Sequence, residues 1–230
     1  IKFVDCNKED LCISYDDLVL KVKKYNPKAV WVVHIGGHIS FEIEKISSFC
    51  KNNNILLIED CAHAHGASFK NKKPGSWGEA GVYSLYATKT ISTGEGGLLV
   101  SKNDKLIEFA RSFKNYGKPE NVINGKNLRM SEFSAALGCI QVNRLKDIVE
   151  WKNNYVEKHI SKYTNNLKLP NTMISGRYKF IVFDKIEKST GKVYDTGCHK
   201  IFKENINLPN TDWVNNNHWC VPLYYRGDEI

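Results

Sequence analysis

The sequence predicts an α/β fold built around a mostly parallel sheet. Two short apolar runs, at residues 29–34 and 55–58, have the length and composition of buried strands. Each run follows a stretch with helical periodicity, at residues 14–26 and 41–51. Strands that alternate with helices along a chain are typical of a parallel sheet covered by helices.

The individual elements follow from local signals. Ser14, with acidic residues directly after it, predicts a helix start, and Asn26-Pro27 predicts its end. Three asparagines after residue 51 end the second helix. The other elements expected in the first half are strands at 1–5, 81–85 and 97–101, and a helix at 102–116.

The chain changes character after a long helical pattern that runs from Ser131 to about Tyr163. Beyond it we expect one alternating strand at residues 178–183 and an asparagine-rich loop at 205–217. We therefore divide the chain into a large domain, 1–150, and a smaller α+β domain, 151–230.

Charge and cysteine content limit the function classes. The chain of 230 residues carries 33 Lys and Arg against 25 Asp and Glu, a formal net charge of +8. These cations are scattered, so we expect phosphorylated small molecules as partners and no nucleic acid. Seven cysteines without a C-x-x-C pair indicate free thiols in a reducing compartment, hence the cytoplasm. No apolar run has membrane-spanning length, so no membrane partner is expected.

A carboxylate and an amine follow two of the predicted strands. The run at 55–58 ends in Glu59-Asp60, and Lys89 lies in a Thr/Ser/Gly-rich loop after the strand at 81–85. Ligands bind at the carboxyl ends of strands in open α/β sheets. Pyridoxal 5'-phosphate (PLP) needs a lysine for its imine and an acid that keeps the pyridine nitrogen protonated. Asp60 and Lys89 are suited to these tasks, and the Ser84 hydroxyl can bind phosphate.

Each of these features also has a purely structural explanation. An aspartate at a strand end is often a turn or cap residue, and a single lysine is most often a solvated surface charge. The histidines could also indicate zinc. We predict no metal site, because H-x-x-x-H aligns both rings only on a helix, and Gly36-Gly37 breaks one. The residues considered for zinc are His34, His38, Cys61, His63 and His65.

The order of the motifs resembles the DegT-type (DegT/DnrJ/StrS) sugar aminotransferases, a PLP-dependent family of fold type I. The family pattern of E/D-D-x-A-[QH]-A-x-G-A, S-[FLY]-x-x-[TG]-K and T-G-E-G-G is matched in order. It reads here as E-D-C-A-H-A-H-G-A from Glu59, S-L-Y-A-T-K from Ser84 and T-G-E-G-G from Thr93. V-H-I-G-G from Val33 and N-L-R-M-S-E from Asn127 are similar to two further family segments.

The resemblance implies a role for each of five residues. Lys89 would be the catalytic residue and form the imine with PLP, and Asp60 would hold the pyridine nitrogen. His63 would lie near the phenolic oxygen of the cofactor, and Ser84 would bind its phosphate. Asn127 would reach the phosphate in a neighbouring subunit, which implies a homodimer with shared sites.

The resemblance further implies transfer of an amino group, with glutamate as the expected donor, to a nucleotide-linked keto-sugar. A related group of sugar dehydratases has histidine where this chain has Lys89, which makes that activity the weaker alternative. Family members begin upstream of the position that matches Ile1, with a Gly-Thr phosphate turn that has no counterpart here. The other alternative is therefore a truncated or split, non-catalytic piece that lacks the N-terminal part of the fold.

Overall fold

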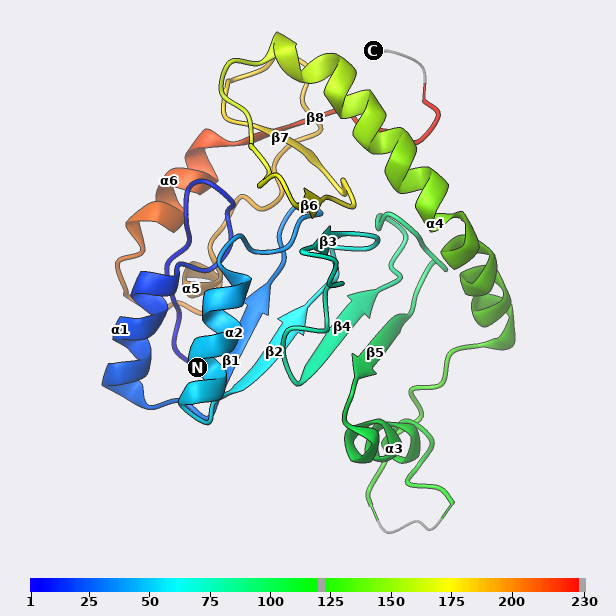
Figure 1. Cartoon of the computed structure of the whole chain (residues 1–230). Helices are drawn as coiled ribbons and strands as arrows, with labels where there is room; N and C mark the ends of the chain where they lie inside the picture. The colour runs from blue at the N-terminus through cyan, green and yellow to red at the C-terminus, as the bar shows by residue number, and fades with distance from the viewer. Residues whose placement is uncertain (120–122, 228–230) are drawn as a thin grey trace.

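The computed structural model describes residues 1–119 and 123–227. Its centre is a four-stranded sheet in the order β1-β2-β4-β5 (Figure 1). The first three strands of this order are parallel, and β5 is antiparallel to β4 at the edge. The predicted α/β fold with a mostly parallel sheet is confirmed. The strands are β1 (Ala29–Val33), β2 (Leu56–Asp60), β4 (Ala80–Ser84) and β5 (Gly97–Ser101).

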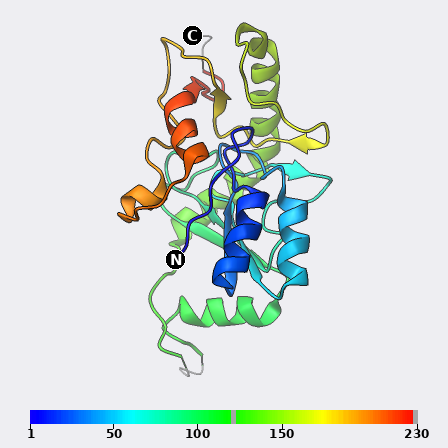
Figure 2. The ribbon, with the colours of Figure 1, turned by 90° about the vertical axis from the view of Figure 1, so that its left-hand side faces the viewer.

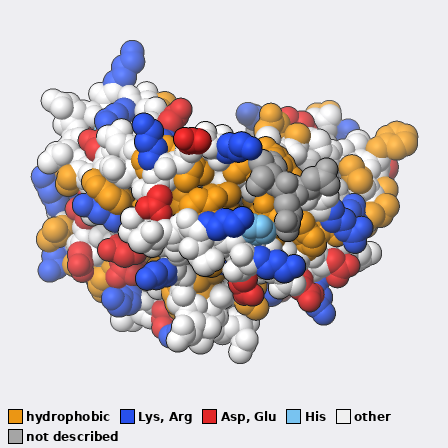
Figure 3. Space-filling model, turned by 90° about the horizontal axis from the view of Figure 1, so that it is seen from above, with side chains coloured by type: hydrophobic (Ala, Val, Ile, Leu, Met, Phe, Trp, Pro, Cys, Tyr) orange, Lys and Arg blue, Asp and Glu red, His pale blue; other side chains and the backbone are white. Residues whose placement is uncertain are grey.

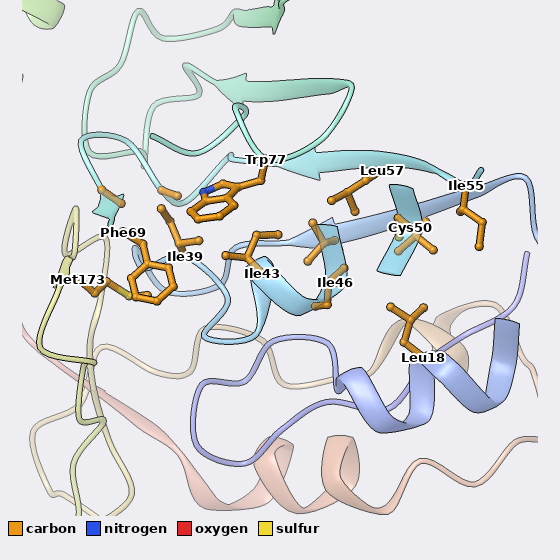
Figure 4. Close-up of a cluster of buried hydrophobic side chains, with 14 of the residues drawn as sticks. Leu18, Ile39, Ile43, Ile46, Cys50, Ile55, Leu57, Phe69, Trp77 and Met173 are labelled. Carbon is orange, nitrogen blue, oxygen red and sulfur yellow. The ribbon is translucent and has the colours of Figure 1, made fainter. Parts of the chain in front are cut away.

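Two helices, α1 (Tyr15–Tyr25) and α2 (Ile43–Asn52), cover one face of the sheet (Figure 2). As predicted, the Ser14 side chain accepts a hydrogen bond at the start of α1, and Asn26 ends the helix with a φ of 43°. The two helices bury their apolar stripes against the sheet in the cluster shown in Figure 4. Full burial of one such side chain contributes about 1.5–3 kcal/mol. The cluster includes Leu18, Val30, Val32, Ile43, Ile46 and Leu57.

The remaining elements are the long helix α4 and several short helices and strands, most of which follow the sheet in the sequence. The predicted long helix is α4, and the Oγ atom of Ser131 accepts from the backbone nitrogen of Ser134 at its start. Two short antiparallel pairs, β3 with β6 and β7 with β8, join segments that are distant in sequence. The bounds are β3 Ser68–Phe69, α3 Asp104–Phe113, α4 Glu132–His159, η1 Ile160–Lys162, β6 Met173–Ile174, β7 Phe180–Val182, α5 Cys198–Ile201, α6 Pro209–Asn217 and β8 Trp219–Val221.

The prediction of a strand at residues 1–5 is wrong. This segment is extended but pairs with no strand among the described residues, and only Cys6 forms an isolated bridge, with Ile13. Its side chains hold it instead, because the Asp5 carboxylate accepts from the backbone nitrogens of Asn210 and Thr211 and from the Thr211 hydroxyl. An apolar run alone does not distinguish these two ways of fixing an extended segment.

The prediction of a loop at residues 205–217 is also wrong for its second part, which is helical. Residues from Pro209 onward form α6, and the proline occupies the first turn, where its missing N–H costs nothing. Val214 is fully buried against Leu11 and Ile181. This packing outweighs the low helix propensity of the asparagines.

The domain division at residue 150 stays a prediction. The helix α4 continues without interruption through that position. One hydrophobic cluster also combines Cys6 and Leu11 with Leu167, Ile181 and Val214. Residues from both sides of the predicted boundary therefore share a core.

The second face of the sheet is open. Trp31, Leu56 and Leu99 point to this face and are 57%, 54% and 38% exposed. Trp31 and Leu56 alternate along their strands with the residues buried under α1 and α2. The face opposite these helices thus carries apolar side chains that no other described element covers.

The surface carries mixed charge. On the face shown in Figure 3, lysine and arginine side chains are scattered among acidic and apolar ones. This distribution agrees with the scattered cations of the sequence. None of the helices in residues 1–119 and 123–227 is both long and apolar enough to cross a membrane.

Candidate active site

Asp60 and Ser84 end two adjacent parallel strands, as predicted. Asp60 pairs with Val82 across the sheet, so Ser84, two residues further along β4, lies on the same face. Both side chains are half-buried. The Oδ1 atom of Asp60 accepts from the backbone nitrogen of Ala62 at 2.9 Å. Its second carboxylate oxygen has no hydrogen-bond partner in the described part of the chain, and it remains available to a ligand.

Lys89 lies in the tight loop between β4 and β5. Its backbone nitrogen donates to the carbonyl of Tyr86 at 3.0 Å, and Thr93 donates to the carbonyl of Leu85 at 3.0 Å. Gly96, with a φ of 144°, then returns the chain to β5. These bonds place a half-buried lysine beyond the end of the same strand that carries Ser84.

His63 brings a neutral imidazole to the same place. Its ring stacks on Tyr178 with centroids 4.3 Å apart, and its Nδ1 accepts from the backbone nitrogen of Gly36 at 3.4 Å. Burial, followed by the nearby charges of Lys89 and Lys179, lowers the pKa of His63 to about 3. The ring is therefore neutral at physiological pH, with its hydrogen on Nε2.

Tyr178 connects these residues, and the sequence reasoning missed it. Besides stacking on His63, its hydroxyl lies 3.3 Å from the Oγ1 of Thr88, and the ammonium of Lys89 lies 5.1 Å from the ring centroid. The alternating pattern at residues 178–183 predicts a strand. It does not predict that Tyr178 contacts the loop that carries Thr88 and Lys89. No spacing rule relates residue 178 to residues 63 and 89.

A two-glycine turn after β1 holds the Tyr178 segment in place. The carbonyl of Gly37 accepts from the backbone nitrogen of Gly176 at 2.7 Å, and that of Gly36 accepts from Lys179 at 2.9 Å. A Cβ atom at Gly37 would lie 2.4 Å from the backbone nitrogen of Tyr178. Only glycine permits this approach, and both turn residues have positive φ, 70° and 116°.

Asn127 is not brought to this cluster. It is exposed, pairs with Asn115 in an isolated bridge and accepts from the Nε of Arg129 at 3.0 Å. This segment follows α3 and makes no contact with the other four predicted residues in the described structure. Its role across a subunit boundary stays a prediction.

A buried carboxylate lies directly before Asp60. Glu59 accepts from the Nε2 of His34 at 3.0 Å and from the backbone nitrogens of Gly75, Trp77 and Gly78, each at 2.7 Å. Ligand atoms of Glu59, His34 and Cys61 lie within 4.8 Å of one another. However, four donors already satisfy the carboxylate, and the Nδ1 of His34 accepts from Ser40. This group is complete as a hydrogen-bonded support for the loop before β4.

A cavity lies elsewhere, between α4 and the β3–β6 pair. It has a volume of about 740 Å³ and is lined by residues that include Lys73, Glu150, Asn153 and Arg177. None of the five predicted site residues lines it. The functional groups therefore indicate a site at the strand ends, separate from this cavity.

The donor set at the strand ends fits PLP. This cofactor offers an aldehyde, a protonated pyridine nitrogen, a phenolic oxygen and a phosphate. The site offers an amine in Lys89, a carboxylate in Asp60, an imidazole N–H in His63 and a hydroxyl in Ser84. No carboxylate within the described ranges lies at ion-pair distance from Lys89, so none of these residues competes with a ligand for its ammonium.

Comparison with known proteins places the chain in a family. The profile of the DegT/DnrJ/EryC1/StrS aminotransferase family matches residues 1–175. The chain belongs to this family. The resemblance inferred from the motifs is thereby confirmed.

Family relatives extend well beyond the matched region. GDP-perosamine synthase of Vibrio cholerae is 34% identical over 169 residues, covering 70% of this chain and 44% of the relative. UDP-4-amino-4,6-dideoxy-N-acetyl-beta-L-altrosamine transaminase of Campylobacter jejuni (strain 81-176) is 29% identical over 215 residues, 86% and 57% of the two chains. The DegT-family chain thus spans about half the length of these curated relatives.

A solved structure agrees with the fold. A DegT DnrJ EryC1 StrS aminotransferase from Brucella abortus superposes with a TM-score of 0.89 at 20% identity. The superposition covers 99% of this chain and 69% of that one. At this identity the likeness establishes the fold, which confirms the fold-type-I expectation, and the roles of individual residues rest on the geometry above.

Proposed function

We propose that the protein is a PLP-dependent aminotransferase that transfers an amino group, with glutamate as the expected donor, to a nucleotide-linked keto-sugar. The observation that carries this proposal is the convergence of Lys89 and His63 on one aromatic ring, beyond strand ends that carry Asp60 and Ser84. The names of the relatives, a GDP-sugar synthase and a UDP-sugar transaminase, support the substrate class.

Each site residue would have one task. Asp60 would hold the proton of the pyridine nitrogen, Ser84 would donate its hydroxyl to the phosphate, and the Nε2–H of His63 would donate to the phenolic oxygen. Bound PLP supplies an electron sink for the negative charge that develops at a substrate carbon. Lys89 would attach the cofactor and, once released, move a proton between the α carbon of the donor and the cofactor.

We further propose a homodimer with shared sites. Asn127 is exposed and apart from the other site residues, as its predicted role toward a neighbouring subunit requires. The first half of α4 also exposes apolar side chains, with Phe133 at 91%, Ile140 at 58% and Leu137 at 42%. A large domain at 1–150, a small domain at 151–230 and a cytoplasmic location complete the proposal.

A second candidate function follows from the length of the relatives. Because the chain covers 44% and 57% of the two curated relatives, it could depend on a separate piece and be non-catalytic by itself. A Gly-Thr phosphate turn would be the expected contribution of such a piece. PLP binding that requires an added polypeptide would favour this candidate.

The test is covalent capture of PLP at Lys89. The chain is incubated with PLP and reduced with borohydride, and its peptides are weighed. We expect the mass of reduced cofactor on the peptide that contains Lys89, no labelling in Lys89→Ala, and full labelling in the surface control Lys102→Ala. Equal labelling of Lys89→Ala would contradict the assignment. Captured protein is then offered glutamate and keto-sugar nucleotides, and amino-sugar products are detected by mass.

A further inference from the structure

A second lysine borders the same aromatic ring as Lys89. The ammonium of Lys179 lies 5.1 Å from the ring centroid of Tyr178, the same distance as the ammonium of Lys89. The backbone of Lys179 is fixed, since its nitrogen donates to the carbonyl of Gly36. The side chain is half-buried. Two positive charges from distant parts of the chain therefore meet at one ring.

In the described part of the chain, these two charges have no counter-charge. Within residues 1–119 and 123–227, no carboxylate lies at ion-pair distance from Lys89 or Lys179. A third lysine, Lys152 of α4, is 7% exposed and donates to the carbonyl of Arg177. Burial and then the charge of Lys179 lower the pKa of Lys152 to about 8, which indicates that the ammonium groups of Lys152 and Lys179 repel one another. An anion bound beside Lys179 would relieve this repulsion.

We propose that Lys179 binds an anionic oxygen group of a substrate beside Lys89. This inference rests on the proposed function, in which Lys89 is occupied by PLP and Lys179 remains for the incoming reactant. The group is either a carboxylate of an acidic amino donor or the diphosphate of the nucleotide sugar. Both present the negatively charged oxygens that an ammonium recognises.

The competing explanation is structural. A lysine over a tyrosine ring can be held by cation–π attraction and by packing of its stem, with no ligand. This explanation predicts that removal of the ammonium changes stability but not anion affinity. The two explanations therefore differ in a binding measurement that does not depend on turnover.

The experiment is calorimetric titration of the cofactor-free chain with 2-oxoglutarate and, separately, with inorganic pyrophosphate. We expect Lys179→Gln to weaken the binding of one probe by about tenfold, as for loss of a charge-assisted hydrogen bond. Lys179→Arg should retain the affinity, and the exposed control Lys168→Gln should match the parent chain. The probe that responds identifies the donor carboxylate or the diphosphate as the source.

Two outcomes would overturn the inference. One is equal affinity of Lys179→Gln and the parent chain for both probes, whether or not the unfolding midpoint changes. The other is no binding of either probe by the parent chain. Borohydride capture at Lys89 is measured in parallel, so that the proposals fail separately. Capture without Lys179-dependent binding refutes only this inference, and Lys179-dependent binding without capture refutes only the proposed function.

Discussion

Gly37→Ala should be among the most destabilising single changes in this chain. The new Cβ would lie 2.4 Å from the backbone nitrogen of Tyr178 and 2.8 Å from that of Arg177. Neither backbone atom can rotate away as a side chain could. The φ of 116° adds strain of about 1–3 kcal/mol for a residue with a Cβ.

Separation of the two segments adds to this cost. The hydrogen bonds from Gly176 to Gly37 and from Lys179 to Gly36 would lengthen, each with a net loss of about 0.5–1.5 kcal/mol. We expect a total of about 2–6 kcal/mol, a large fraction of the stability of an ordinary domain. The stack of Tyr178 on His63 would open as well, because both rings depend on this turn.

Urea unfolding followed by tryptophan fluorescence measures the effect, and Gly191→Ala is the matched control. Gly191 also has a positive φ, 92°, but a Cβ there meets no heavy atom within 4 Å. Its substitution should cost only the conformational strain, about 1–2 kcal/mol. If both variants lose the same stability, the close approach of the Tyr178 segment to the turn is not what requires glycine, and the reasoning is refuted.

Three further predictions concern buried titratable groups. Glu59→Gln should cost about 2–4 kcal/mol, since an amide NH₂ would face backbone N–H donors. His34 and the backbone donors lower the pKa of Glu59 below its ordinary 4.5 against the effect of burial, so this stability is present above pH 4.5 and lost below it. Lys152→Met should abolish a rise in stability of about 3 kcal/mol between pH 8 and 10.5, the interval between the folded and ordinary pKa values. The ring resonances of His63 should not titrate between pH 5 and 8.

Unfolding midpoints across pH check the first two of these predictions, and NMR checks the third. A Glu59→Gln curve parallel to that of the parent chain from pH 3 to 7 would contradict the first. An undiminished rise in Lys152→Met above pH 8 would contradict the second. A His63 titration near pH 6.5 would show that the imidazole is not buried against Tyr178.

The positions of Asp60 and Ser84 could be predicted because they depend on local information. A short apolar run predicts a strand, and the rule that parallel strands end at a common edge then places the residues that follow. Lys89 could be placed by the same argument, since its loop begins at the end of β4. Each of these inferences needs only a few neighbouring residues.

Tyr178 and Lys179 could not be placed in this way. Their segment reaches the site through backbone hydrogen bonds to a turn at Gly36-Gly37, about 140 residues earlier in the chain. Backbone bonds of this kind leave no pattern of side-chain types. The helix α6 was not predicted for a related reason. The burial of Val214 against Leu11 stabilises the helix, and local helix propensity contains no information about this contact.

Glu59 and Lys179 are both charged residues near this site, but we expect different roles for them: Glu59 supports the structure, and Lys179 binds a ligand. Glu59 is fully buried, yet four donors satisfy its carboxylate, so its charge has no capacity left for a ligand. Lys179 is only half-buried, but no described carboxylate answers its charge, and a second ammonium lies across the same ring. The hydrogen-bonded carboxylate of Glu59 fixes the loop before β4. Lys179, which no described carboxylate neutralises, is therefore the residue beside Lys89 that we propose for binding an anionic reactant.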